Sequence, residues 1–123
     1  MTFYEQMVPA LSALLKTGEI LETPIYGTLI RKGDHAFGYF GLTNTAILVA
    51  LLQGSSKKLG LSGRIPLNSI QRTNVRKRLF LPVYILRLEL AEGIVIKIQA
   101  SKKVIGFDTQ GKNLDTFLSC FQQ

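Results

Sequence analysis

The chain has 123 residues, of which 46% are hydrophobic and 19% charged, and it carries a formal net charge of +7. These proportions fit one globular domain over residues 1–123 and exclude an intrinsically disordered chain. One cysteine and one histidine exclude an internal disulfide and the zinc sites that need several such ligands. The longest apolar run, residues 46–52, is much shorter than the roughly 20 residues of a membrane-spanning helix.

The N-terminal segment has no basic leader ahead of an apolar stretch, so we expect no signal peptide. A chain without a leader, a disulfide framework or a membrane span is expected in the cytoplasm. The sequence therefore predicts a soluble cytoplasmic protein, with a peripheral position at the inner membrane face as an option.

Helical spacing is confined to the two ends of the chain. Residues 2–17 predict a helix, because their apolar residues recur every three or four positions. Thr2 and Glu5 match a capping box at its start. Pro9 is expected to kink or divide this helix, and Gly18 is expected to end it.

A second amphipathic helix is predicted at residues 113–122, with Asn113 as its cap. Its apolar residues recur at the spacing that places them on one face. They are Leu114, Phe117, Leu118 and Phe121.

Between the helices, residues 24–108 show strand-like runs separated by turn residues. Residues 46–52 are apolar at every position, which favours a strand buried on both faces. The glycines and serines of residues 54–63 predict a loop. The expected strands are residues 25–31, 37–42, 46–52, 64–67, 70–78, 83–91 and 94–100, followed by a brief segment at 104–107.

Two features locate strands within the expected sheet. Pro66 indicates an edge strand, because proline cannot donate a hydrogen bond to the ladder. Residues 83–100 alternate between apolar and polar positions on either side of Glu92 and Gly93. This pattern predicts a hairpin with a tight turn.

Two motifs resemble bacterial pleckstrin-homology-like domains. The sequence GLTNTAILV at residues 41–49 is similar to their second hairpin, in which a Leu-Thr-Asn turn leads into a hydrophobic third strand. The sequence RIPLNSIQ at residues 64–71 is similar to their fourth strand and following turn, and to those of the related GRAM domains. The resemblance covers about residues 22–122.

The resemblance implies a mainly β fold: a barrel of about seven antiparallel strands in two packed sheets, closed by the C-terminal amphipathic helix. The N-terminal helix is an addition to this core. Phosphoinositide-binding members use several basic residues around the first hairpin. Here that hairpin offers Arg31 and Lys32 beside Asp34, so the phosphoinositide site is not carried over.

Positive charge is concentrated in the middle of the chain. Residues 35–88 contain eight Lys and Arg and no Asp or Glu, whereas the rest of the chain contains seven basic and eight acidic residues. Such a block attracts anions such as nucleic acid, acidic lipid or an acidic protein patch. The alternative is a solvated face that only keeps the protein soluble. The candidate anion-binding residues are Arg72, Arg76, Lys77, Arg78, Lys57 and Lys58.

Three apolar residues, Leu79, Phe80 and Leu81, directly follow the densest basic segment. This combination suits an acidic phospholipid surface, where charge attracts the protein and inserted apolar side chains retain it. In the alternative, Leu79 and Leu81 begin the next strand and point into the core. Exposure of Leu79 or Phe80 beside the basic residues distinguishes the two.

Other classes of binding partner also fit the sequence. An acidic protein could bind the same basic segment. Nucleic acid could also bind it, with Phe37, Tyr39 and Phe40 stacking on single-stranded bases, although hairpin aromatics more often belong to the core. A protein-interaction module could use a sheet edge near Pro66 or a groove beside the closing helix. The N-terminal helix or a sheet edge could also join two copies of the chain.

No residue pattern points to catalysis. His35 lies beside Asp34 in an expected turn, and a lone histidine there is typical of a surface. Cys120 has no basic neighbour in sequence to activate it, so a half-buried packing role is expected. Residues 54–63 lack the Gly-Lys-Ser/Thr ending of a phosphate loop. We therefore expect a non-enzymatic binding module with no catalytic residue, no metal and no cofactor.

Overall fold

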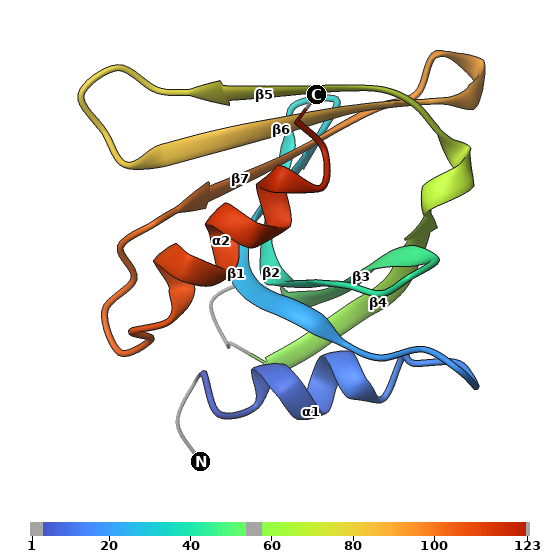
Figure 1. Ribbon diagram of the computed structural model, residues 1–123, viewed down its shortest axis with the longest axis vertical. Helices are drawn as coiled ribbons and strands as arrows, with labels where there is room; N and C mark the ends of the chain where they lie inside the picture. The colour runs from blue at the N-terminus through green and yellow to red at the C-terminus, as the bar shows by residue number, and fades with distance from the viewer. Residues whose placement is uncertain (1–3, 54–57, 123) are drawn as a thin grey trace.

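The computed structural model describes residues 4–53 and 58–122. The elements follow the predicted order of helix, strands and helix (Figure 1). They are α1 (Met7–Ser12), β1 (Glu22–Arg31), β2 (Asp34–Leu42), β3 (Ala46–Gln53), β4 (Lys58–Pro66), the 3-10 helix η2 (Leu67–Ser69), β5 (Ile70–Lys77), β6 (Val83–Leu90), the 3-10 helix η3 (Ala91–Gly93), β7 (Val95–Ser101) and α2 (Gln110–Ser119).

Within these residues, seven antiparallel strands form one sheet in the order β4-β3-β2-β1-β7-β6-β5. β1 also pairs with β7, for example through Leu29 and Ile98. The two sheets expected from the sequence are therefore two halves of one continuous sheet. This sheet curls into a half-barrel, and α2 lies across its opening (Figure 1). The predicted seven antiparallel strands, closing helix and N-terminal helix are confirmed.

Apolar clusters cover both faces of β3. The inner cluster joins the concave face of the sheet to α2 and includes Ile47 and Val49. The outer cluster joins α1 to the opposite face and includes Leu48 and Ala50. Side chains alternate between the two faces of a strand, so residues 46–52 are apolar throughout because each face meets a core. The prediction of a strand buried on both faces is confirmed.

The N-terminal helix is shorter than expected and packs on its own chain. The helix α1 spans Met7–Ser12, and Met7 and Leu11 are buried against the sheet. Pro9 falls in the first turn, where no intrahelical N–H bond is lost, so it neither kinks nor divides the helix. The expected stop at Gly18 was wrong, although Gly18 does adopt a left-handed φ of 86° in a later turn. Thr2 of the expected capping box lies outside the described residues.

Of three predictions within the strand region, two were wrong and one is confirmed. β4 begins at Lys58, so the loop expected over residues 54–63 was wrong in its second part. Pairing with β3 forms a strand there despite the glycines and serines. Pro66 ends β4, which is an edge strand as predicted. Residues 104–107 form no strand, because a turn bond runs from the Phe107 N–H to the Val104 carbonyl (3.2 Å).

The closing helix begins earlier than expected, at Gln110. Asn113 is therefore not its cap; its side-chain amide donates to the Pro24 carbonyl (2.9 Å). Gln110 is fully buried. Its amide oxygen accepts from the Tyr26 N–H (3.0 Å), and its amide nitrogen donates to the carbonyls of Tyr26 (2.8 Å) and Ser101 (3.0 Å). One side chain thus ties α2 to both β1 and β7.

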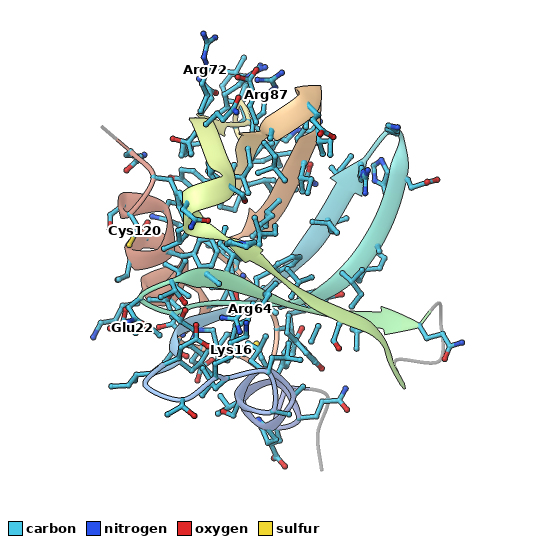
Figure 2. All side chains as sticks on the ribbon, turned by 90° about the vertical axis from the view of Figure 1, so that its right-hand side faces the viewer. Lys16, Glu22, Arg64, Arg72, Arg87 and Cys120 are labelled. Carbon is cyan, nitrogen blue, oxygen red and sulfur yellow. The ribbon has the colours of Figure 1, made fainter. Side chains whose placement is uncertain are left out.

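Glu19 links the segment before β1 to the β2–β3 turn and to β4. Its carboxylate accepts hydrogen bonds from the hydroxyls of Thr43 and Thr45, between β2 and β3, and forms an ion pair with Arg64 of β4. The Lys16 backbone N–H also donates to it (2.7 Å); Lys16 and Arg64 lie close together in Figure 2. These donors, Thr45 first, lower the pKa of Glu19 to about 2 from an ordinary value of 4.5.

We expect Glu19→Gln to destabilise the fold at neutral pH. A carboxyl whose pKa is lowered on folding stabilises the protein above its unfolded pKa and loses that contribution as the pH falls through its folded pKa. The difference in unfolding free energy between wild type and Glu19→Gln should therefore shrink between pH 4.5 and about 2. Urea unfolding at pH 7, well above this range, and at roughly pH 2.5, near its lower end, measures the change.

The control is Glu22→Gln, which removes an exposed carboxylate from the start of β1. A Glu19→Gln variant as stable as Glu22→Gln at pH 7 would show that the Glu19 contacts contribute nothing to the fold.

Candidate binding surface on the β5–β6 hairpin

The β5–β6 hairpin forms one end of the curled sheet. β5 is an edge strand that pairs with β6 from Ile70↔Leu90 to Lys77↔Tyr84. Residues 78–82 connect the two strands. The Arg78 N–H donates to the Val83 carbonyl (2.9 Å) and closes the loop. Phe80 has a left-handed φ of 62°, which is unfavourable for a bulky side chain. This backbone conformation turns the chain sharply at the tip.

The apolar tip, which we define as Leu79, Phe80 and Leu81, projects into solvent. Leu79 is 82% exposed, Phe80 94% and Leu81 48%. The alternative in which Leu79 and Leu81 point into the core was therefore wrong. The left-handed turn interrupts the alternation of side chains along a strand, so all three side chains of the tip point into solvent. The loop lies at the upper left of Figure 1, away from α1.

The basic flank, which we define as Arg76, Lys77 and Arg78, leads directly into this tip. All three residues are exposed. Among the described residues, the carboxylates in ion pairs are Glu19, Glu89 and Asp115, and none of them pairs with the basic flank. Three full positive charges therefore stand beside an exposed apolar loop, available to an anion from outside.

Arg72 belongs to a separate cluster on the outer face of the sheet. Its Nε lies 3.8 Å from Oε2 of Glu89, and Nη1 of Arg87 lies 2.6 Å from the other oxygen of the same carboxylate. The hydrogen bond from Arg87 is the main cause of the lowered pKa of Glu89. Figure 2 shows Arg72 and Arg87 together at the same end of the molecule. Glu89 thus offsets part of the charge here, unlike at the basic flank.

Strand register adds basic residues that the sequence analysis missed. Arg87 pairs with Asn74 on one side and with Lys97 on the other. Arg87 and Lys97 therefore share the outer face with Arg72 and Arg76. The alternation of residues 83–100 placed Arg87 and Lys97 opposite the apolar positions. Only the pairing of β5, β6 and β7 shows that they adjoin one another.

The remaining two candidates are Lys57 and Lys58. Lys57 lies outside the described residues. The backbone of Lys58 begins β4, the edge strand at the opposite end of the sheet order from β5. The surface at the hairpin therefore consists of the apolar tip, the basic flank and the neighbouring Arg72 cluster.

The aromatic residues considered for base stacking are not gathered on one exposed surface. Tyr39 and Phe40 are fully buried, whereas Phe37 is 56% exposed. Phe37 stacks on Tyr26, with ring centroids 6.3 Å apart. Two of the three aromatics thus serve the core, and a single exposed ring remains on that part of the sheet.

The two residues that the sequence analysis weighed for catalysis lie on the protein surface. His35 is exposed in β2, not in a turn, and Cys120 is exposed at the end of α2 rather than half-buried. In residues 4–53 and 58–122, no group of three or more His, Cys, Asp or Glu side chains is placed to hold a metal ion. No helix within the same residues is long and apolar enough to cross a membrane.

Two solved structures share this architecture. The hSac2 domain from human phosphoinositide phosphatase Sac2 matches with a TM-score of 0.60 and 16% identity, covering 96% of this chain and 77% of that one. The pleckstrin homology domain from Shewanella amazonensis SB2B matches with a TM-score of 0.51 and 19% identity, covering 94% of this chain and 95% of that one.

Sequence comparisons find no matching family model and no matching curated protein. The strand order, the closing helix and the structural matches agree with the resemblance of residues 41–49 and 64–71. The chain has a pleckstrin-homology-like fold.

Proposed function

We propose that this chain is a non-enzymatic binding module that attaches to anionic membrane surfaces through its β5–β6 hairpin. The observation that carries the proposal is an exposed apolar tip directly flanked by three basic side chains without ion-pair partners among the described residues. A cationic surface alone would suit many anions. An exposed leucine and phenylalanine beside it add a reason to prefer a surface with an apolar interior.

The two parts of the hairpin supply complementary contributions. Each basic residue near an anionic leaflet contributes about 1 kcal/mol, which falls with salt. Apolar side chains that enter the acyl region contribute in proportion to the area they bury and depend little on salt. Three basic residues and three apolar ones can therefore hold the protein reversibly at the membrane.

The fold agrees with such a role. Pleckstrin-homology-like domains commonly mediate lipid or protein binding, and the two structural neighbours belong to this fold. The human neighbour is a domain of a phosphoinositide phosphatase. We place this chain peripherally at the inner membrane face, where acidic phospholipids would be its partner.

Co-sedimentation with vesicles tests the proposal. We expect the wild-type protein to bind vesicles of phosphatidylcholine with phosphatidylserine and to remain in solution with phosphatidylcholine alone. The variant R76S/K77S/R78S should bind the anionic vesicles about a hundredfold more weakly at low salt, from three losses of about 1 kcal/mol each. The difference in affinity between wild type and this variant should be smaller at near-physiological salt, because exposed charges are then screened.

A matched variant, K16S/R31S/K32S, removes the same charge from exposed side chains outside the hairpin. Equal losses in the two variants would mean that net charge, rather than the basic flank, drives binding. Absence of vesicle binding at both salt concentrations would overturn the membrane proposal. Retention of the wild type on single-stranded RNA or on an acidic protein, but on no vesicle, would assign the basic flank to that partner instead.

A further inference from the structure

A second exposed apolar residue stands on a different loop at the same side of the molecule. Ile105 is 98% exposed, more than any other large hydrophobic side chain among the described residues. It lies in the segment between β7 and α2, beside the exposed Lys103. In Figure 1 this segment and the β5–β6 loop both lie at the left-hand side.

Direct contacts connect this segment to the base of the hairpin. The Lys102 N–H donates to the Pro82 carbonyl (2.8 Å). Ile105 and Val83, the first residue of β6, line the same hollow of about 450 Å³. The two loops therefore have a fixed relation to each other, although residues 82 and 102 are distant in sequence.

The segment is also fastened on its other side, so Ile105 stands out from an anchored backbone. Nζ of Lys102 lies 2.8 Å from the Asp115 carboxylate of α2 and 5.5 Å from the centre of the Tyr84 ring. The Asp115 bond raises the pKa of Lys102. Phe107 stacks on Tyr4, with ring centroids 5.7 Å apart. Exposing an isoleucine from a tied loop is costly in water, since its apolar area stays hydrated.

We propose that residues 103–105 form a second membrane contact, in which Ile105 inserts beside the apolar tip and Lys103 meets the anionic headgroups. This inference rests on the proposed function and extends it. One loop would leave the domain free to tilt about a single point. Two tied loops define an edge, and that edge fixes the orientation of the domain, with the segment before β1 on the side away from the bilayer (Figure 1).

Single-tryptophan reporters test the insertion, because the chain has no tryptophan of its own. The variants Ile105→Trp and Phe80→Trp report the two loops. Ile20→Trp is the matched control, since Ile20 is 75% exposed and belongs to the segment before β1. In Figure 1 that segment lies at the opposite side of the molecule. The probe is a vesicle of phosphatidylserine and brominated phosphatidylcholine. We expect a blue shift and quenching for the two loop reporters and neither for the control.

The outcomes separate the two proposals. Quenching of Phe80→Trp without quenching of Ile105→Trp would overturn the second contact and leave the proposed function intact. Co-sedimentation without quenching of either reporter would also overturn it, since binding would then be purely electrostatic. No co-sedimentation and no quenching would overturn both proposals together.

Affinities provide a second readout. We expect Ile105→Ser to weaken binding to anionic vesicles about tenfold, the loss of partial burial of one isoleucine, and Ile20→Ser to leave it unchanged. Lys103→Ser should weaken binding about fivefold at low salt. Equal affinities for Ile105→Ser and Ile20→Ser would contradict the second contact.

Discussion

Gln110→Leu is expected to lower the free energy of unfolding by about 2 to 4 kcal/mol. Leucine matches the size of glutamine but leaves the Tyr26 N–H and the carbonyls of Tyr26 and Ser101 without this partner. A buried polar group left unsatisfied costs about 1–3 kcal/mol, and part of that cost is recovered where water reaches the backbone. The resulting loss is a large fraction of the stability of a small domain.

Urea unfolding followed by circular dichroism measures this loss. The matched control is Gln122→Leu, which makes the same replacement at an exposed site just beyond α2. If Gln110→Leu lost no more stability than Gln122→Leu, the bonds of Gln110 to β1 and β7 would not hold α2 in place.

Gln110 also explains why the start of the closing helix was predicted three residues too late. The apolar stripe that identifies the helix begins at Leu114, and a polar residue before it gives no periodic signal. The side chain of Gln110 instead makes hydrogen bonds to the backbone of β1 and β7. Such a role depends on partners far away in sequence and cannot be read from local spacing.

The predictions that succeeded depend on local patterns with a single physical meaning. The all-apolar run of β3 was correctly predicted as a strand buried on both faces. The alternation around Glu92 and Gly93 correctly gave the β6–β7 hairpin. The start of β4 was missed because its glycines and serines are typical of loops. Pairing with β3, an effect of tertiary structure, overrides that preference.

Only part of the candidate surface could be predicted from the sequence. The basic flank and the apolar tip are contiguous in sequence, so their proximity could be predicted. Exposure of the whole tip could not, since it depends on the left-handed backbone at Phe80. Arg87, Lys97 and Ile105 join this side of the molecule only through strand register and the contact between Lys102 and Pro82.

The double variant L79S/F80G is expected to bind anionic vesicles about a hundredfold more weakly than wild type at near-physiological salt. Burying a leucine or phenylalanine side chain fully contributes about 1.5–3 kcal/mol, and insertion at the headgroup boundary buries part of each. The double loss is thus about 3 kcal/mol, or about a hundredfold in affinity. Unlike the loss in R76S/K77S/R78S, it should stay nearly constant as salt is raised, because apolar burial is not screened.

This variant tests binding without weakening the fold. Glycine accepts the left-handed φ of 62° at position 80 better than phenylalanine does, and both side chains are exposed. The thermal unfolding midpoint should therefore be unchanged or slightly higher. Ile20→Ser, which removes another exposed apolar side chain, should retain wild-type binding. Wild-type affinity in L79S/F80G, with binding still lost on removing the basic flank, would show that the hairpin acts by charge alone and that its exposed apolar tip does not enter the bilayer.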